Sequence, residues 1–317
     1  MSFERLKQKV REIPEVSSWP QMLALIERTT HQDLLSVWEH PVAACQSVGG
    51  SAGDALPVAA AVFCSVISIH LVDDMLDDDP RGDYHRLGTG AVANLALAFQ
   101  AAGHRLLDAA PAPAAVRAAL QASFAAMSLG TCFGQSLDTQ PVGSEAEYWR
   151  VVEAKTPPLF GEALRMGALL GGADGESAAR LARLGRLLGR FIQVNDDLAD
   201  ALEAPACPDW QRRHNNLPIL YALTAEHAER SEFCRLSLQV DAPEALAAAQ
   251  RILFRSGAVS YCTLKLIEFS REIRALLDSL SLPATCPVAR LVELHMKPLH
   301  RLLETVGVED PMALSLS

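Results

Sequence analysis

The sequence predicts an all-α protein that folds as a single domain over residues 1–317. Its composition favours helices, because half of the residues are hydrophobic while only 6% are aromatic. A β-sandwich would need more β-branched and aromatic residues. Helical periodicity recurs almost throughout the chain, and no stretch of useful length alternates between apolar and polar residues as a strand does.

Glycine and proline residues mark the ends of the expected helices. Breaks fall at Gly49-Gly50, at Pro111 to Pro113 and at Pro283, and no stretch has the composition of a long linker. The helices are expected over residues 2–12, 18–29, 31–47, 54–79, 88–108, 112–137, 145–171, 175–203, 216–226, 230–238, 242–255, 257–280 and 286–306.

The charge and the cysteines exclude several kinds of partner. A net charge of −10 offers no general surface for phosphate, so nucleic acid is not expected. Seven cysteines are scattered singly, without the spacing of a zinc site or a redox motif, which fits reduced thiols in a cytoplasmic protein. The charged first residues, MSFERLKQKVREIPEV, contain no apolar run that would indicate a signal peptide.

Residues 55–72, ALPVAAAVFCSVISIHLV, are nearly long enough to span a membrane. They contain polar side chains, among them Ser65, Ser68 and His70, and they run directly into Asp73. We therefore expect a buried core helix here and no integral membrane segment.

Two long apolar helices end in nearly the same acidic pattern, HLVDDMLDDD and FIQVNDDLAD. Residues four apart share one face of a helix, so Asp73 and Asp77 point the same way. Asp196 and Asp200 repeat this arrangement. Each pattern follows an apolar run, which predicts that it lies near the end of a buried helix.

Such clusters of carboxylates need a compensating charge. At about 4 Å two like charges repel by roughly 4 kcal/mol at an effective dielectric constant of 20. Mg²⁺ prefers carboxylate oxygens, and it typically takes one or two of them together with phosphate oxygens and water. The paired patterns therefore predict several Mg²⁺ ions around a diphosphate leaving group, with a hydrocarbon held in a cavity lined by the helices.

At these motifs the chain resembles the trans-isoprenyl diphosphate synthases, also called polyprenyl synthetases. The resemblance covers about residues 40–225 and includes, in order, HLVDDMLDDDPRG, GQSLD, Tyr148 with Lys155-Thr156, FIQVNDDLAD and NLPILYAL. It implies the class I isoprenoid synthase fold, an all-α bundle with a central active-site cavity, usually as a homodimer. It also implies an enzyme that uses Mg²⁺, three ions per site, on an allylic prenyl diphosphate.

The resemblance also implies a set of metal ligands. Asp73 and Asp77 resemble the ligands of two Mg²⁺ ions, with Asp74 in support. Asp196 resembles the ligand of the third ion, and Asp200 lies nearby.

Further positions resemble those that handle the allylic diphosphate. Arg81, Lys155 and Gln193 match positions that hold it or support its departure. Thr156 matches a residue near the incipient cation. Three more positions match residues that support the site: Gln135, Asp138 and Asp197.

The length of the prenyl chain can be estimated from the helix before Asp73. In the family, bulky aromatic residues just before the first Asp motif block longer chains. Here Ser65 and Ser68 occupy the face that would line the hydrocarbon pocket, with Ile69 adjacent and Phe63 as a possible floor. These small residues predict room for a C15 or C20 chain.

The chain departs from the family on the side of its second substrate, isopentenyl diphosphate. The family carries a basic GGKRxRP element before the first Asp motif, but no Lys or Arg occurs here between Arg28 and Arg81. His40-Pro41 stands where Arg-Pro is usual, Val66 replaces a His or Gln, and His214 replaces a lysine after the second motif. Losing three or four charge-assisted bonds of about 1.5–3 kcal/mol each would weaken binding by several powers of ten.

Three reactions remain open, and all begin with ionisation of an allylic diphosphate. The cation cyclises or loses a proton to give a terpene, it is captured by an unusual acceptor, or it elongates with isopentenyl diphosphate as in farnesyl and geranylgeranyl diphosphate synthases. The missing basic residues favour the first, a class I terpene synthase activity. An inactive partner subunit is a remote alternative, against which the intact Asp motifs argue.

Overall fold

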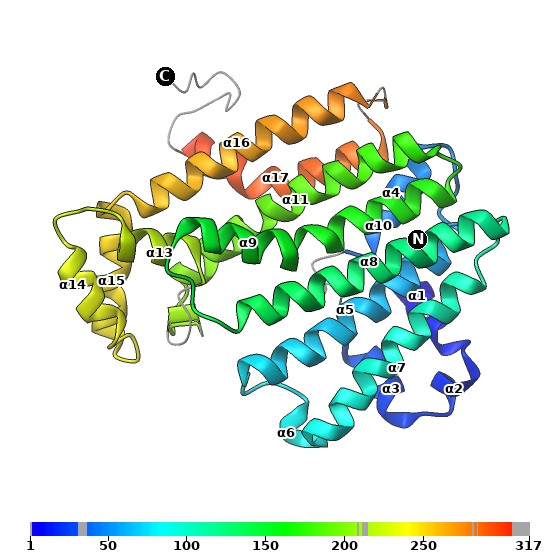
Figure 1. Ribbon diagram of the computed structural model, residues 1–317, viewed down its shortest axis with the longest axis horizontal. Coiled ribbons are helices and arrows are strands. Elements are labelled where there is room, and N and C mark those ends of the chain that lie inside the picture. The colour runs from blue at the N-terminus through cyan, green and yellow to red at the C-terminus, as the bar shows by residue number, and fades with distance from the viewer. Residues whose placement is uncertain are drawn as a thin grey trace. The chain divides into compact units, whose positions relative to one another are not determined.

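The computed structural model describes residues 2–30, 37–207, 209–210, 215–280, 282–283 and 285–305, and of residues 302, 304 and 305 only the backbone. This part of the chain is helical and contains no strand (Figure 1), which confirms the predicted all-α class. The chain divides into two compact units. The first comprises Met1–Cys132, Pro158–Arg186 and Leu277–Val292, and the second comprises Phe133–Pro157, Leu187–Leu276 and Glu293–Ser317. The single domain expected from the sequence stays a prediction.

The helices are distributed over the two units as follows. The first unit contains α1 (Phe3–Arg11), α2 (Pro14–Ser17), α3 (Pro20–Arg28), α4 (Glu39–Ser47), α5 (Leu56–Asp77), α6 (Tyr84–Leu87) and α7 (Thr89–Asp108). The second contains α9 (Glu145–Lys155), α13 (Leu217–Thr224), α14 (Arg230–Ser237) and α15 (Pro243–Arg255). Residues from both units belong to α8 (Ala114–Asp138), α10 (Pro157–Leu170), α11 (Gly175–Leu202), α16 (Ala258–Ser279) and α17 (Pro287–Thr305).

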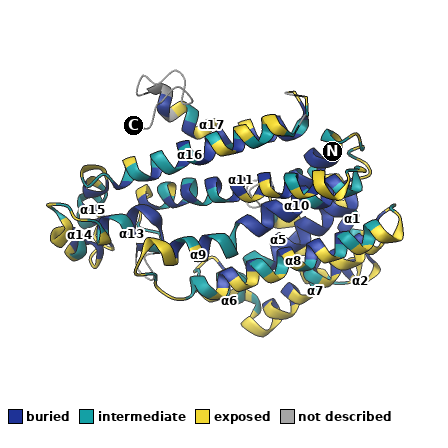
Figure 2. Ribbon diagram, turned by 45° about the horizontal axis from the view of Figure 1, so that its top comes forward, coloured by how far each residue is buried: buried dark blue, intermediate teal, exposed yellow. Residues whose placement is uncertain are grey.

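Burial around α5 is nearly complete over most of its length. Every residue from Leu56 to Ser68 is buried, and α7 packs alongside (Figure 2). Among the described helices, α5 is long and apolar enough to cross a membrane by length and composition, but 78% of its most apolar stretch is buried inside the protein. This burial agrees with the core helix that the sequence predicts.

A left-handed residue ends α5 directly after its acidic motif. Asp78 has φ 52°, and the Asp79 backbone N–H donates to the Asp74 carbonyl at 2.9 Å. Aspartate is among the few residues other than glycine that adopt this conformation readily. The turn therefore stops the helix here and leads the chain toward Arg81.

One expected helix, over residues 145–171, is wrong, because it is two helices. Helix α9 ends at Lys155, Thr156 caps it, and α10 begins at Pro157. A proline lacks the N–H that would continue the helical ladder, and it disfavours helical geometry in the residue before it. The break places Lys155 and Thr156 at a helix end, where side chains can reach a ligand.

The remaining expected helices agree with the structure within a few residues at each end. The short helices α2 and α6 are absent from the prediction, because four residues are too few to show a period. Residues 31–36 of the expected helix over 31–47 lie outside the described residues.

A separate apolar cluster holds the helices α13, α14 and α15 of the second unit together. The ring centroids of Trp210 and Phe233 lie 5.8 Å apart at its centre. Ile219, Leu253 and Ala201 also belong to the cluster, so the C-terminal part of α11 is anchored against these helices. This anchoring fixes the helix that carries the second Asp motif.

Candidate active site

The first Asp motif occupies the last two turns of α5. Asp73, Asp74 and Asp77 lie where the partial negative charge of the helix dipole accumulates, which disfavours further negative charge. Burial, and then the charges of Asp79 and Asp83, raise the pKa of Asp74 to about 6. The motif therefore needs protons or cations to offset its charge.

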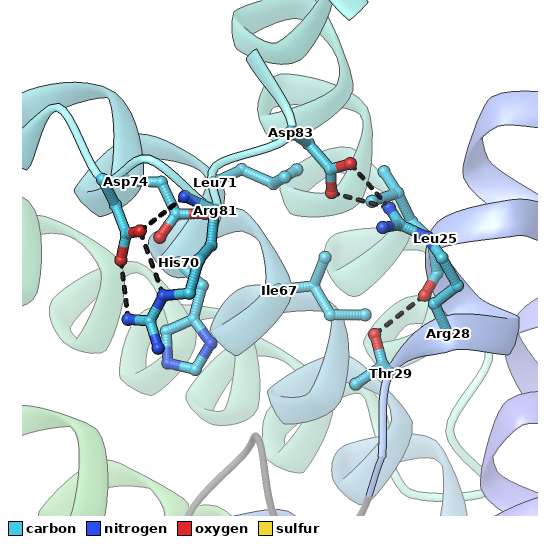
Figure 3. Close-up of a pocket in the computed structure, with 10 residues that line it drawn as sticks. Leu25, Arg28, Thr29, Ile67, His70, Leu71, Asp74, Arg81 and Asp83 are labelled. Carbon is cyan, nitrogen blue, oxygen red and sulfur yellow. Dashed lines mark hydrogen bonds and ion pairs between the residues drawn. The ribbon is translucent and has the colours of Figure 1, made fainter. Parts of the chain in front are cut away.

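Arg81 approaches the first motif through a carboxylate for which the sequence suggested no role. Its backbone N–H and its guanidinium both donate to Asp79, with the Nη2 contact at 2.8 Å (Figure 3). This hydrogen bond lowers the pKa of Asp79. The Arg81 side chain is 88% exposed, so the pair lies at the protein surface.

A pocket of about 410 Å³ opens beside this motif in the first unit. In Figure 3, Arg28 from α3 and Asp83 lie together on one side of the pocket. Both Asp83 carboxylate oxygens accept from Arg28 Nη2, at 2.8 and 2.6 Å. His70 and Arg81 lie on its other side. The pocket lining consists of Leu25, Arg28, Thr29, Ile67, His70, Leu71, Asp74, Asp79, Arg81 and Asp83.

Sequence reasoning missed Arg28 and His70 as candidate site residues. Arg28 is the last basic residue before the long stretch without Lys or Arg, and this was the available signal. His70 lies one helical turn after Val66, on the same face of α5.

The second Asp motif lies near the end of α11, in the second unit. Burial, followed by the charge of Asp200, raises the pKa of Asp196 to about 7. Burial, followed by the charges of Asp209 and Glu203, raises the pKa of Asp200 to about 6. These two carboxylates thus share the electrostatic condition of Asp74.

Asp197 differs from its neighbours because neutral donors surround it. The Tyr148 hydroxyl donates to it at 2.7 Å, the Leu217 backbone N–H at 2.8 Å and the Gln193 amide at 2.9 Å. The carboxylate is buried, and these bonds oppose the rise in pKa that burial causes. These bonds hold the Asp197 side chain in place, and its role as a support of the site stays a prediction.

The network continues from Asp197 to Thr156. The Thr156 hydroxyl donates to Gln193 Oε1 at 2.6 Å, while Gln193 Nε2 faces Asp197. The structure thus brings together three of the predicted site residues, Thr156, Gln193 and Asp197, in one chain of hydrogen bonds.

Lys155 and Asp138, two further predicted site residues, form an ion pair, with Nζ and Oδ2 2.5 Å apart. A Cβ atom on Gly134 would lie 2.2 Å from the Lys155 backbone nitrogen, so only glycine allows α8 to approach the end of α9 this closely. Gln135, the next residue, is buried, and both polar atoms of its amide lack a hydrogen-bond partner in the protein. A buried amide without a partner is costly, which indicates that a ligand or water satisfies it.

The predicted chain-length residues divide between two faces of α5. Ser68 donates to the Ala96 carbonyl at 2.9 Å, and Ser65 accepts from Gln100 at 3.3 Å, so both face α7. The Phe63 ring packs instead against Phe3 of α1 at 5.8 Å. Ile69 is half-buried. The structure therefore does not bring Phe63 together with the two serines.

The positions of the missing basic element are buried and mostly apolar. His40 is fully buried, and its ring contacts the edge of Phe160 at 5.0 Å. Trp38 packs against Phe3 at 5.7 Å, and Val66 is buried in α5. His214 lies outside the described residues.

The donor chemistry of both motifs fits Mg²⁺. Among the described residues, no group of three or more His, Cys, Asp or Glu side chains is arranged to hold a metal ion. Mg²⁺ does not require one, because it usually binds one or two carboxylates and completes its shell with phosphate oxygens and water. Crowded carboxylates with raised pKa values at the C-terminal ends of helices suit such an ion.

Comparison with known proteins identifies the family. Residues 42–253 match the family described as polyprenyl synthetase. The chain belongs to the polyprenyl synthetase family. This membership confirms the resemblance inferred from the Asp motifs.

Curated relatives of the chain carry the names of prenyl diphosphate synthases. The geranylgeranyl diphosphate synthase of Mycobacterium tuberculosis is 32% identical over 223 residues, covering 65% of this chain and 62% of that protein. The short chain isoprenyl diphosphate synthase of Methanothermobacter thermautotrophicus is 30% identical over 253 residues, covering 74% of this chain and 77% of that protein. These names agree with the predicted enzyme class, and they fit the prenyltransferase alternative better than the terpene synthase activity that the missing basic residues favoured.

Solved structures share the fold. A geranylgeranyl pyrophosphate synthetase from Pyrococcus horikoshii matches with a TM-score of 0.77 at 19% identity, over 93% of this chain and 94% of that one. A polyprenyl synthase from Caulobacter crescentus matches with a TM-score of 0.77 at 20% identity, over 94% and 97%. The all-α architecture is thus that of the family.

The raised pKa values predict how Mg²⁺ stabilises the protein. In the absence of a cation, Asp74, Asp196 and Asp200 bind protons in the folded state up to about pH 6 to 7, whereas the unfolded chain releases them near 3.8. Their contribution to the free energy of unfolding is therefore lost as the pH rises through 6 to 7. We expect Mg²⁺ to raise the melting temperature by several degrees at pH 8 and by clearly less at pH 5.5, where protons compete.

Differential scanning fluorimetry at both pH values measures this effect. Asp196→Asn should reduce the gain at pH 8, and Asp108→Asn, an exposed change on α7, should not. An equal gain at the two pH values would contradict the assignment.

Proposed function

We propose that the chain is a trans-prenyltransferase that elongates an allylic prenyl diphosphate with isopentenyl diphosphate. The observation that carries the proposal is the pair of Asp motifs at buried helix ends in a chain of the polyprenyl synthetase family. The names of the curated relatives support elongation over cyclisation. In this reaction the allylic C1–O bond breaks and diphosphate leaves, the isopentenyl double bond forms the new C–C bond, and a proton is lost.

The carboxylates of the two motifs would hold Mg²⁺. In the first motif the proposed ligands are Asp73 and Asp77 with Asp74 in support, and in the second they are Asp196 and Asp200. Bound Mg²⁺ would neutralise the leaving diphosphate. Both motifs end apolar helices, which is where a hydrocarbon chain with a charged head would place that head.

Cationic and polar side chains would orient the allylic diphosphate. Lys155, fixed by Asp138, and Arg81, fixed by Asp79, would donate charge-assisted hydrogen bonds to its oxygens. The amide of Gln193 would add to this set. The Thr156 hydroxyl donates a hydrogen bond to Gln193, so the lone pairs of its oxygen would face the incipient cation.

The second diphosphate needs cations that the usual sequence element does not provide. Besides Arg81, which is assigned above to the allylic diphosphate, the pocket of the first unit offers Arg28 and His70 as two basic side chains near Asp74. Arg28 is about half-exposed, and both of its bonds to Asp83 come from Nη2, so a bound anion could take its other donors. We assign this pocket to the diphosphate of the second substrate.

A second candidate function is transfer of the prenyl group to an acceptor without a diphosphate. Its support is the burial of Val37, Trp38 and His40 where the family's basic element would be. The product assay below separates the two candidates.

Purified protein with Mg²⁺ and C10, C15 or C20 allylic diphosphates should make longer diphosphates only when isopentenyl diphosphate is present. Chromatography of the dephosphorylated products measures the chain length. Asp73→Asn should lower the rate by at least about a hundredfold, because it removes a charge that acts in the transition state. Asp108→Asn is the control. Hydrocarbon or alcohol made without isopentenyl diphosphate would overturn elongation in favour of a terpene synthase.

Arg28→Gln should raise the KM for isopentenyl diphosphate by roughly tenfold or more and leave the KM for the allylic substrate unchanged, because one charge-assisted bond of about 1.5–3 kcal/mol is lost. Arg86→Gln is the matched control, since Arg86 also donates to Asp83 at 2.8 Å but does not line the pocket. Initial rates with each substrate varied in turn give both constants. An equal effect of the two variants would show that Asp83 matters and the Arg28 charge does not.

We further propose that the protein is a homodimer. Leu97 on α7 and Leu129 on α8 are 71% and 72% exposed, so each presents apolar surface that a partner subunit could cover. Covering them would gain up to about 1.5–3 kcal/mol each. The double variant Leu97→Glu/Leu129→Glu should run as a monomer in size-exclusion chromatography with light scattering. Leu238→Glu, at an 82% exposed leucine outside α7 and α8, should not change the mass. A monomeric wild type would refute the proposal.

A further inference from the structure

The segment Asn215-Asn216-Leu217 leads into the NLPILYAL motif, which begins at Asn216 and to which the proposed chemistry gives no role. It immediately precedes Pro218 in the first turn of α13, and Asn216 caps that helix through Ile219 N–H. A proline in the first turn suits a helix start and restricts the backbone. The segment is therefore anchored on its C-terminal side.

Asn215 binds the residue that holds Lys155. Its Nδ2 donates to Asp138 Oδ1 at 2.9 Å, to the Asp138 carbonyl at 3.0 Å and to the Gln140 carbonyl at 2.9 Å. Its Oδ1 accepts from the Val142 backbone N–H at 3.0 Å. One side chain thus fixes both the loop after α8 and the orientation of the Asp138 carboxylate, which presents its other oxygen to Lys155.

The next two residues, Asn216 and Leu217, bind Asp197, which is the centre of the network that contains Gln193 and Thr156. Asn216 is fully buried and donates to the Asp197 carbonyl at 2.8 Å, while the Leu217 N–H donates to the Asp197 carboxylate at 2.8 Å. Asp197 in turn orients Gln193, and Gln193 accepts from Thr156.

We propose that Asn215 is a positioning residue, part of a clamp formed by residues 215–217 that sets Lys155 and the Thr156–Gln193 pair in one geometry. Adjacent residues of one short segment make the hydrogen bonds to Asp138 and to Asp197. A shift of that segment would therefore move Lys155 and the Thr156–Gln193 pair together, and with them both predicted contacts to the substrate. Lys155 and Thr156 are themselves adjacent at the break between α9 and α10. The clamp therefore holds Lys155 through Asp138, and it holds Thr156 through Asp197 and Gln193. Its effect on catalysis rests on the proposed function, whereas its effect on Lys155 does not.

An amine-labelling experiment tests, without any substrate, whether Asn215 positions Lys155 through Asp138. The chain has five lysines, and the rate of modification at each can be followed by mass spectrometry. Asn215→Ala should raise the rate at Lys155 by roughly tenfold, because the charge-assisted pair with Asp138 is loosened. Lys9 and Lys265, which pair with Glu12 and Glu268, are internal references and should not change.

Asp138→Asn provides the second variant, since it keeps the shape that Asn215 contacts and removes only the ionic partner of Lys155. It should reproduce the increase at Lys155. An unchanged rate at Lys155 in both variants would overturn the proposal. A rise at all lysines together in both variants would also overturn it, because it would assign Asn215 a role in global stability only.

A double-mutant cycle tests the consequence for turnover. Asn215→Ala should lower kcat/KM by about tenfold in the wild type and by less than about twofold in a Lys155→Ala background, because it acts through Lys155. Asn94→Ala, an exposed change on α7, is the control. An equal loss in both backgrounds would overturn the positioning role. If wild type turns over no prenyl diphosphate, the proposed function fails, and the labelling result still decides the clamp.

Discussion

The placement of carboxylates at the C-terminal ends of buried helices is the constraint on which both Asp motifs depend. A helix end of this kind carries partial negative charge, and a buried carboxylate loses its hydration as well. Burial, and then the charges of neighbouring carboxylates, raise the pKa values of Asp74 and Asp196, so both groups favour protons or cations. The arrangement has no advantage for folding, so its occurrence on α5 and again on α11 is best explained by a ligand that brings positive charge.

In the second motif, the adjacent carboxylates of Asp196 and Asp197 have different surroundings. Asp197 receives three neutral donors, so its position is fixed, and burial still raises its pKa to about 7. Asp196 and Asp200 lie four apart on another face of α11, where burial and the charges of neighbouring carboxylates raise their pKa values. In the proposed function Asp197 is a support, and Asp196 and Asp200 are metal ligands. The one-residue offset between Asp196 and Asp197 suits these roles, because successive residues on a helix point in different directions.

Local patterns predicted the fold and the motifs, whereas long-range contacts could not be predicted. Apolar periodicity indicated the long helices, and four-residue spacing placed Asp73 with Asp77. The break at Pro157 was missed because the sequence is helical on both sides and a proline is tolerated where a new helix begins. The Arg28–Asp83 pair joins residues 55 apart in sequence, and no spacing rule reports such a contact.

The chain belongs to the family although it lacks the family's basic element. The two observations are compatible, because other side chains near the first Asp motif are basic. Where that element would be, His40 and Trp38 are packed into the apolar core, so these side chains contribute to packing there. The basic groups near the first motif come instead from the end of α3 and from α5 itself, as Arg28 and His70. In the proposed function a diphosphate at Arg28 would have to compete with Asp83, a carboxylate that Arg28 already shares with Arg86. The proposed allylic side would differ, because Lys155 and Gln193 are held in place by hydrogen bonds within the protein. Less binding energy would then be lost to reorganisation on that side, which would favour formation of the prenyl cation over discrimination among its acceptors.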